Sequence, residues 1–199
     1  RERWKDVDFS APINNDQNHP EEIRIRQQNY AAMIENIDTQ IGRYLDLLDE
    51  RGELDNTVIL FSSDHGEMLG DHNRWQKSIW YRGSVDVPLL VKGPGISEQL
   101  SRALVGFHDI GATILDLAGA EPLDGDAFSF KSVLSGETSH HRRVNKSALN
   151  DWKLVSDGRF KLVLSEGEDP LLFDLREDPG ETKDLAEEFP CKVKQLQAL

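Results

Sequence analysis

Residues 57–71 read TVILFSSDHGEMLGD and join an apolar, β-branched run to a polar loop. The run 57–61 has the composition of a buried strand. Asp64 and His65 follow it, so we expect both just past the carboxyl end of that strand, where ligands collect in open α/β sheets. Gly66 allows the backbone to turn sharply there. An adjacent carboxylate and imidazole predict half of a metal site, because a complete site needs three or more protein ligands.

A long amphipathic helix precedes this strand. Residues 23–51 carry apolar side chains three or four positions apart, which is the spacing of one helix face. These side chains are Tyr30, Ile34, Ile37, Ile41, Tyr44, Leu45 and Leu48. Gly52 supplies a stop signal before the strand. Residues 1–22 are polar and predict a loop or an extended segment.

More strands and a second helix follow the polar loop. Residues 87–91 predict a second short buried strand, and residues 103–105 predict a third. We expect a helix with Asp109 as its N-cap and Gly119 at its end. Strands and helices that alternate in this way predict an α/β fold, a layered sheet with helices on its faces.

The last quarter of the chain predicts a small antiparallel sheet. Apolar runs lie at 152–155, 159–164 and 171–175, and Ser156-Asp157-Gly158 between the first two is a hairpin turn signal. A closing helix is expected over 185–199. We therefore expect two domains, with residues 1–143 in the main α/β domain and 144–199 in the small sheet domain.

A polar stretch separates these two domains. Residues 135–143 include His140-His141-Arg142-Arg143, which superficially resembles a metal-binding histidine doublet. The neighbouring arginines favour a solvated loop instead.

The composition narrows the classes of partner. A net charge of −13 argues against nucleic acid and anionic membranes, because both need a positive surface. No run of 18 or more apolar residues occurs, so no transmembrane helix is expected. Cys191 is the only cysteine, which excludes a disulfide within the chain.

The order of motifs resembles the C-terminal half of the sulfatases, a family of the alkaline-phosphatase superfamily. No single motif is specific, but their order along the chain is. The motifs are Asn36-Ile37-Asp38 with Ile41-Gly42, residues 63–72, Lys77, Val87-Pro88-Leu89, Gly93-Pro94-Gly95, His108-Asp109-Ile110, Gly158-Arg159-Phe160-Lys161-Leu162, Leu172-Phe173-Asp174-Leu175 and Asp178-Pro179-Gly180-Glu181.

The resemblance implies an alkaline-phosphatase-like fold, here incomplete, and a metal-dependent sulfuric ester hydrolase. In sulfatases a formylglycine hydrate attacks sulfur, and a divalent cation, usually Ca²⁺, holds the hydrate and the sulfate oxygens. Asp64 and His65 match two of the cation ligands. Lys77 matches the lysine that contacts the sulfate and helps to stabilise the leaving group. His72 lies in the same loop, either as a substrate contact or as a hydrogen-bonding residue that fixes the loop.

The motif that supplies the family's nucleophile is missing. Formylglycine is made from the Cys or Ser of Cys/Ser-x-Pro-x-Arg, and neither form occurs in this sequence. Cys191 precedes Lys192-Val193-Lys194 and does not fit the motif. Because the chain begins at Arg1, we expect a fragment whose nucleophile lies upstream and which is inactive alone. Its substrate would be a sulfate ester of a small molecule or a carbohydrate, and its incomplete surface predicts self-association.

Two alternatives stay open. A phosphonate monoester or phosphodiester hydrolase of the same superfamily shares the Asp-His-Gly loop and the lysine, with Mn²⁺ or Zn²⁺ in place of Ca²⁺, and a histidine ligand suits these borderline metals. A non-catalytic binding or structural fragment is the other alternative. Trp75, Trp80 and Tyr81 flank Lys77 and serve either a substrate pocket or core packing.

Overall fold

The computed structural model describes residues 2–16, 19–122 and 124–199, which form two compact units. The first unit holds the described residues up to Lys77 together with Gly83–Pro94. The second holds Ser78–Arg82 and the described residues from Gly95 onward. The predicted domain boundary at residue 143 stays a prediction.

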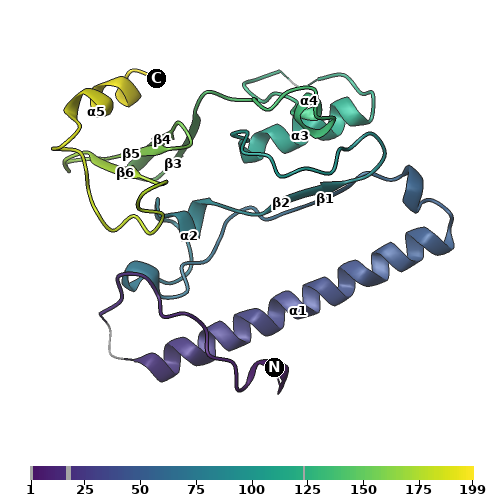
Figure 1. Ribbon diagram of the computed structural model, residues 1–199, viewed down its shortest axis with the longest axis horizontal. Helices are drawn as coiled ribbons and strands as arrows, with labels where there is room; N and C mark the ends of the chain where they lie inside the picture. The colour runs from purple at the N-terminus through teal and green to yellow at the C-terminus, as the bar shows by residue number, and fades with distance from the viewer. Residues whose placement is uncertain (1, 17–18, 123) are drawn as a thin grey trace. The chain divides into compact units, whose positions relative to one another are not determined.

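The first unit is dominated by one continuous helix, α1 (Pro20–Glu50), drawn in purple to blue in Figure 1. The helix predicted over 23–51 is thereby confirmed. The short helix η1 (Glu2–Trp4) is tied to it, because Arg3 Nη1 and Trp4 Nε1 donate to the Glu35 carboxylate at 2.7 and 2.8 Å. Three side chains of the predicted apolar stripe, Ile34, Ile37 and Tyr44, are each at least 50% exposed. Met33 and Leu47, which lie outside the stripe, are exposed to a similar degree.

A two-stranded antiparallel sheet follows the 3-10 turn η2 (Leu54–Asn56). Strand β1 (Ile59–Ser62) pairs with β2 (Leu89–Lys92), with Ile59 opposite Lys92 and Ser62 opposite Leu89. Both predicted strands exist, but they are only partly buried, because each has one neighbour: Phe61 is 38% and Leu90 is 59% exposed. The loop between β1 and β2 carries η3 (Asp71–Asn73) and α2 (Arg82–Val85).

The predicted third strand is wrong. Within residues 103–105 only Leu104 pairs, in an isolated bridge with Arg142. The helix that follows is α3 (Phe107–Leu117), and it packs with α4 (Lys131–Leu134). Phe130, 1% exposed, is held there by an N–H that donates to Thr113 Oγ1 at 3.0 Å.

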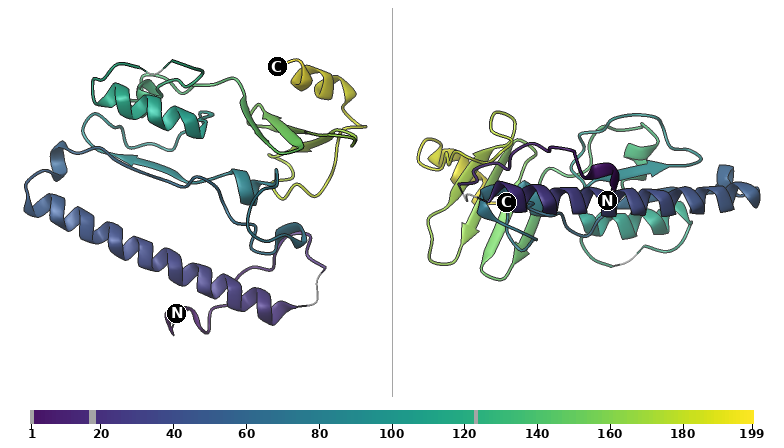
Figure 2. Two further views of the ribbon diagram at one scale, coloured as in Figure 1. Left: turned by 180° about the vertical axis from the view of Figure 1, so that it is seen from behind. Right: turned by 90° about the horizontal axis from the view of Figure 1, so that it is seen from below.

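The C-terminal sheet is four-stranded and antiparallel, in the order β3-β4-β5-β6. Its strands are β3 (Asn145–Leu149), β4 (Trp152–Ser156), β5 (Phe160–Ser165) and β6 (Leu171–Asp174). The last three and the hairpin at 156–158 confirm the predicted sheet, whereas the polar edge strand β3 is new. Helix α5 (Pro190–Gln197) packs beside this sheet (Figure 2) and completes a core of Leu162, Leu172, Val193 and Leu196.

The mixed α/β fold class is confirmed by these elements. Among the described helices, none combines the length and the apolar character that crossing a membrane requires.

Candidate active site

The loop that follows β1 is backbone-strained. Among the residues that the structure describes, eight non-glycine residues have positive φ. Five of them lie within ten positions: Leu69, His72, Asn73, Gln76 and Ser78. Left-handed backbone is unfavourable for L-residues, and it persists where the surrounding contacts enforce it. Such residues cluster at functional sites. The strain therefore marks residues 63–78 as the first place to look for a site.

Gly66 is required by a close approach of two backbone segments. Its N–H donates to the Ser84 carbonyl oxygen at 2.8 Å. A Cβ at this position would lie 2.1 Å from the Gly83 carbonyl oxygen, which is inside van der Waals contact. Only glycine leaves room for this carbonyl, so Gly66 fixes the path of the Asp-His loop.

Internal hydrogen bonds hold the rest of the loop. Glu67 Oε1 accepts the N–H groups of Leu69 and Gln76, at 3.3 and 2.6 Å. The Met68 N–H donates to the Gln76 carbonyl at 2.9 Å, and the Met68 side chain is 1% exposed. The two ends of the loop are thus joined, which brings Lys77 back towards the Asp-His pair.

The N-terminal segment ties the tip of the same loop. The Ile13 N–H donates to Asp71 Oδ1 at 2.8 Å, and the His72 N–H donates to the Ile13 carbonyl at 2.7 Å. Asn73 Nδ2 donates to Asp16 Oδ1 at 2.7 Å. The predicted irregular segment at the start of the chain therefore has a structural role, because it anchors the loop that carries the candidate site.

Asp64, His65 and Lys77 come together. His65 Nδ1 lies 2.9 Å from the Gly66 carbonyl oxygen, which can only accept, so Nδ1 carries the proton and Nε2 presents its lone pair. Lys77 Nζ donates to that Nε2 at 2.9 Å. Asp64 Oδ1 lies 3.8 Å from the same nitrogen. An anionic, a neutral and a cationic group thus surround one point, and the side chains of Asp64 and His65 are 75% and 41% exposed.

These residues fit one part of a metal site. A carboxylate and an imidazole with an unprotonated Nε2 are suitable ligands for a divalent cation. In the described part of the chain, no group of three or more His, Cys, Asp or Glu side chains is arranged to hold a metal ion. This loop could supply two ligands, and a complete site needs others from elsewhere.

The aromatic residues near Lys77 divide between two surroundings. Trp75 packs under Arg26 of α1, with the guanidinium carbon 4.5 Å from the ring centroid. Trp80 lies edge-on to Trp152, at 6.3 Å between ring centroids. Tyr81 lies beside Phe173 at 6.4 Å. Trp80 and Tyr81 therefore pack on the C-terminal sheet, which corresponds to the core-packing alternative.

His141 is the clearest correction to the predicted solvated loop. Its side chain is 7% exposed, and Nε2 donates to Asp109 Oδ2 at 3.0 Å, whereas His140 is exposed. Arg142 makes two further hydrogen bonds to the same carboxylate, at 2.6 and 2.5 Å. His140 is thus exposed to solvent, whereas His141 belongs to an internal ion-pair network.

Asp109 is the centre of that network and not an N-cap. The N-cap of α3 is Gly106, and Asp109, at the third helical position, accepts the Gly106 N–H at 2.9 Å. Burial alone raises the pKa of Asp109, but hydrogen bonds from Arg142, from the Phe128 and Gly106 N–H groups and from His141 outweigh it. The pKa is held far below its usual range.

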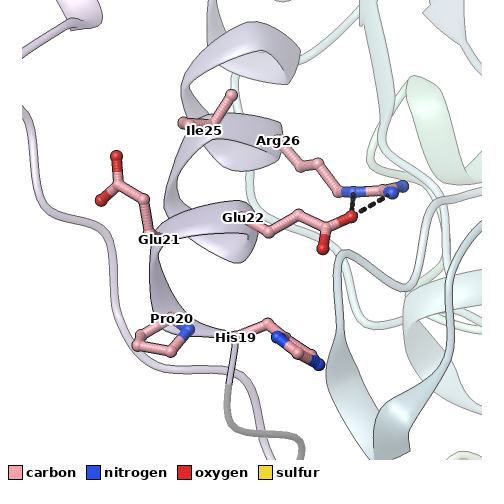
Figure 3. Close-up of a pocket in the computed structure, with 6 residues that line it drawn as sticks. All are labelled: His19, Pro20, Glu21, Glu22, Ile25 and Arg26. Carbon is pink, nitrogen blue, oxygen red and sulfur yellow. Dashed lines mark hydrogen bonds and ion pairs between the residues drawn. The ribbon is translucent and has the colours of Figure 1, made fainter.

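The hollow shown in Figure 3 is lined by other residues than the ones that converge. It opens at the first turns of α1, where Arg26 donates to Glu22 Oε1 at 3.1 and 2.5 Å. Its lining residues are His19, Pro20, Glu21, Glu22, Ile25 and Arg26. None of the predicted site residues is among them, so this hollow is no candidate for the chemistry.

Two buried charged residues were not predicted from the sequence. Lys161 and Glu181 are 2% and 3% exposed and form an ion pair. The available signal was a single lysine inside the apolar run 160–164. Cys191, as expected, lies in the C-terminal helix, and it is exposed.

Comparison with known sequences supports the resemblance found above. The family model described as Sulfatase matches residues 5–120. A choline-sulfatase of Rhizobium meliloti (strain 1021) is 33% identical over 175 residues, which cover 84% of this chain and 34% of that protein. An arylsulfatase of Clostridium perfringens is 33% identical over 184 residues, covering 85% of this chain and 38% of the relative. The chain thus spans little more than a third of their length.

Solved structures agree with these relatives. A structure described as a complex with its substrate D-glucosamine-2-N,6-O-disulfate superposes with a TM-score of 0.82 and 28% identity, over 88% of this chain and 40% of that one. A phosphonate monoester hydrolase of Agrobacterium radiobacter superposes with a TM-score of 0.80, also at 28% identity and over the same shares of the two chains. The family model covers more than half of the sequence, and the chain therefore belongs to the sulfatase family.

Proposed function

We propose that this chain is the C-terminal part of a metal-dependent sulfuric ester hydrolase. One observation carries the proposal: in a sulfatase-family chain, the two predicted cation ligands and the predicted sulfate-binding lysine converge beyond the end of β1. His65 Nε2 is within 2.9 Å of Lys77 Nζ and 3.8 Å of Asp64 Oδ1. The side chains of Asp64 and His65 are 75% and 41% exposed, whereas the ion pair of Lys161 and Glu181 is buried.

Asp64 and His65 are the proposed ligands of a divalent cation. Ca²⁺ is the expected ion, with Mn²⁺ or Zn²⁺ as the alternative, because Ca²⁺ prefers oxygen and an imidazole suits the other two. When bound, such a cation neutralises negative charge on the transferring group and the attacking oxygen. The hydrogen bond from His65 Nδ1 to the Gly66 carbonyl supports this role, because it leaves Nε2 unprotonated.

Lys77 is the proposed contact for the sulfate group. His65 Nε2 has one lone pair, so Lys77 loses this partner whenever His65 serves as a metal ligand. Its three N–H donors are then available to an anionic oxygen of the substrate. An ammonium group held there stabilises charge on the transferring group and on the leaving oxygen. His72, on the same anchored loop, is proposed as a second substrate contact.

The nucleophile is proposed to come from outside these 199 residues. A formylglycine made from a Cys/Ser-x-Pro-x-Arg motif is expected, and the sequence contains no such motif. We therefore expect the isolated chain to be inactive. This expectation agrees with the fraction of the relatives that it spans, 34% and 38% of the two named above.

The substrate is proposed to be a sulfate ester of a small molecule or a carbohydrate. The relatives are described as a choline-sulfatase and an arylsulfatase, and the structure cited above is a complex with a disulfated glucosamine. The net charge of −13 gives no reason to propose nucleic acid or an anionic membrane as a partner.

Phosphonate monoester hydrolysis is the alternative reaction. Two phosphonate monoester hydrolase structures superpose with TM-scores of 0.80 and 0.83 at 28% identity, so overall similarity does not separate the two reactions. The Asp-His loop does not decide between sulfate ester and phosphonate monoester hydrolysis, because the fold alone does not determine the leaving group. A non-catalytic role for the chain is the remaining alternative.

The test is a substrate comparison on the full-length protein encoded with this chain. Purified protein is analysed for bound metals and assayed with an aryl sulfate and an aryl phosphonate monoester. Stoichiometric Ca²⁺ and preferred turnover of the sulfate are expected. Stoichiometric Mn²⁺ or Zn²⁺ with preferred turnover of the phosphonate would replace the proposal by the alternative. No turnover of either ester, in protein that carries metal and an intact nucleophile motif, would favour the non-catalytic role.

A further inference from the structure

Gln76, the residue before Lys77, is bound through both of its main-chain polar groups. Its N–H donates to Glu67 Oε1 at 2.6 Å, and its carbonyl oxygen accepts the Met68 N–H at 2.9 Å. All four residues belong to the first unit. Because the Gln76 carbonyl is part of the peptide group that leads to Lys77, these hydrogen bonds restrain the main chain directly before the proposed sulfate-binding residue.

One oxygen atom of Glu67 supports two strained positions. Oε1 also accepts the Leu69 N–H, at 3.3 Å. Leu69 and Gln76 have φ angles of 49° and 66°, in the left-handed region that is unfavourable for residues with a side chain. Such backbone persists only where the surroundings enforce it. Hydrogen bonds to an ionised carboxylate are stronger than neutral ones, so they suit this purpose.

The segments on both sides of this contact are held in place as well. The Met68 side chain, next to Glu67, is 1% exposed, so the main chain that carries the carboxylate is fixed by packing. The ring of Trp75, next to Gln76, lies against the guanidinium group of Arg26 on α1, at 4.5 Å. The carboxylate therefore links two segments of the first unit that each have an anchor of their own.

Burial does not keep Lys77 in the candidate site. Gln76 and Lys77 are both exposed, and exposed main-chain groups are readily satisfied by water. Loop stability alone therefore gives little reason for a carboxylate at residue 67. What the carboxylate provides is a fixed direction for the chain at Gln76, and the next side chain places its Nζ 2.9 Å from His65 Nε2.

We propose that Glu67 positions Lys77. By holding Gln76, the carboxylate restrains the ammonium group of Lys77 beside His65 Nε2, where the proposed function needs it. Glu67 is a positioning residue, because it acts through the main chain of Gln76. The inference rests on the proposed function for its catalytic meaning but not for its geometry.

The test uses the full-length protein encoded with this chain and substitutions that separate the oxygen of Glu67 from its charge. Glu67→Gln keeps the length of the side chain and an acceptor oxygen but removes the charge. Glu67→Asp keeps the charge but withdraws the oxygen by one methylene group. Glu67→Met has a similar length and no acceptor oxygen.

Amide hydrogen exchange of peptides that contain Gln76, measured by mass spectrometry, reports the hydrogen bond itself. Exchange at Gln76 should accelerate by at least about 10-fold in Glu67→Met and in Glu67→Asp, and should stay close to the parent in Glu67→Gln. Glu35→Met is the matched control. Glu35 on α1 also accepts two hydrogen bonds, from Arg3 and Trp4, and their loss should leave Gln76 exchange unchanged.

Turnover of an aryl sulfate shows whether the restraint reaches Lys77. In Glu67→Met, kcat should fall by at least about 10-fold, because a small misplacement of a catalytic group is costly. Glu67→Asp should show a smaller fall, and Glu67→Gln should stay close to the parent. In a Lys77→Ala background, Glu67→Met should lower kcat by less than about 2-fold further, because a positioning residue acts only through the group that it positions.

The outcomes separate this inference from the proposed function. Parent-like turnover by Lys77→Ala would overturn the proposed role of Lys77 and leave exchange at Gln76 as the test of the geometry. Where Lys77→Ala is impaired, equal losses from Glu67→Met with and without Lys77 would overturn the positioning role. So would unchanged exchange or turnover in folded Glu67→Met, or a loss in Glu67→Gln as large as in Glu67→Met. Where Glu67→Met does not fold, Glu67→Asp replaces it in each comparison.

Discussion

The two sheets of this chain differ in how deeply their side chains are buried. No residue of β1 or β2 is fully buried, and Phe61 and Leu90 keep 38% and 59% of their surface exposed. In the four-stranded sheet, Leu162 and Leu172 are completely buried, and α5 covers them with Val193 and Leu196. One sheet therefore has its own core, and the other lacks one within the described residues.

The buried core and the predicted site residues therefore lie in different parts of the chain. A two-stranded sheet is marginal in water, yet the loop after β1 carries Asp64, His65 and Lys77. The four-stranded sheet carries none of the predicted site residues. Functional residues commonly lie on loops that a rigid scaffold positions. Here the loop is held by hydrogen bonds within the first unit, among them those made by Glu67 and by the segment before α1.

The largest expected effect is on the core of the four-stranded sheet. Leu172→Ala removes a completely buried side chain and should lower the free energy of unfolding by about 2–5 kcal/mol. Urea denaturation followed by circular dichroism measures it. Leu149→Ala, in β3 of the same sheet and 42% exposed, is the control and should cost less than about 1 kcal/mol. Equal losses in the two variants would contradict the assignment of the core.

The next effect is confined to the candidate site. Gly66→Ala places a Cβ 2.1 Å from the Gly83 carbonyl oxygen, so the loop must move, at a cost of about 1–3 kcal/mol. The expected result is loss of amide protection at Gly66 with the C-terminal sheet unchanged. Gly111→Ala in α3, where nothing lies within 4 Å, should instead stabilise by about 0.5–1 kcal/mol. A Gly66→Ala variant with full protection would show that the close approach does not exist.

A pH effect is expected in the second unit, outside the four-stranded sheet. Because the pKa of Asp109 is lowered in the folded state, its stabilisation is present above the unfolded pKa of about 3.9 and is lost as the pH falls further. Thermal unfolding between about pH 5 and pH 2 should show a plateau followed by this loss. Asp109→Asn should be less stable at neutral pH, by about 1.5–3 kcal/mol, and should flatten the pH dependence. If stability depends on pH equally in Asp109→Asn and in the parent chain, Asp109 is not a main source of that dependence.

The smallest effect on stability is expected on the exposed face of α1. Ile37 is 50% exposed, so Ile37→Lys should change the free energy of unfolding by less than about 0.5 kcal/mol. Exposed apolar groups nevertheless favour association, and sedimentation should show self-association of the parent chain that this variant reduces. A parent chain that stays monomeric at all concentrations would contradict the prediction.

Much of the fold followed from local patterns. The stripe through Ile34, Ile37 and Ile41 predicted α1, and the Ser156-Asp157-Gly158 turn predicted the β4–β5 hairpin. The errors have a common cause. Residues 103–105 look like a strand but find only one bridge, and the polar run 145–149 forms an edge strand because β4 offers it a partner. Pairing between strands is not encoded locally.

The candidate site was predicted from motif order, and its connections were not. Asp64 and His65 are adjacent in the sequence, and Lys77 follows His65 by 12 positions. Their convergence depends on the strained turns between His65 and Lys77. His141 looked solvated because its burial depends on Asp109, 32 residues away. The burial of Lys161 and Glu181 was not predicted either, because their hydrogen-bond partners Trp80 and Arg82 lie 81 and 99 residues away along the chain.

The most direct test of the account is hydrolysis of an aryl sulfate by the full-length protein with Lys77 replaced. Lys77→Ala should lower turnover by at least about 100-fold, because it removes the cation that stabilises charge on the transferring group. Lys153→Ala, an exposed lysine on β4, is the matched control and should leave turnover unchanged. Turnover by Lys77→Ala at the rate of the parent protein would contradict the assignment of the active site to this loop.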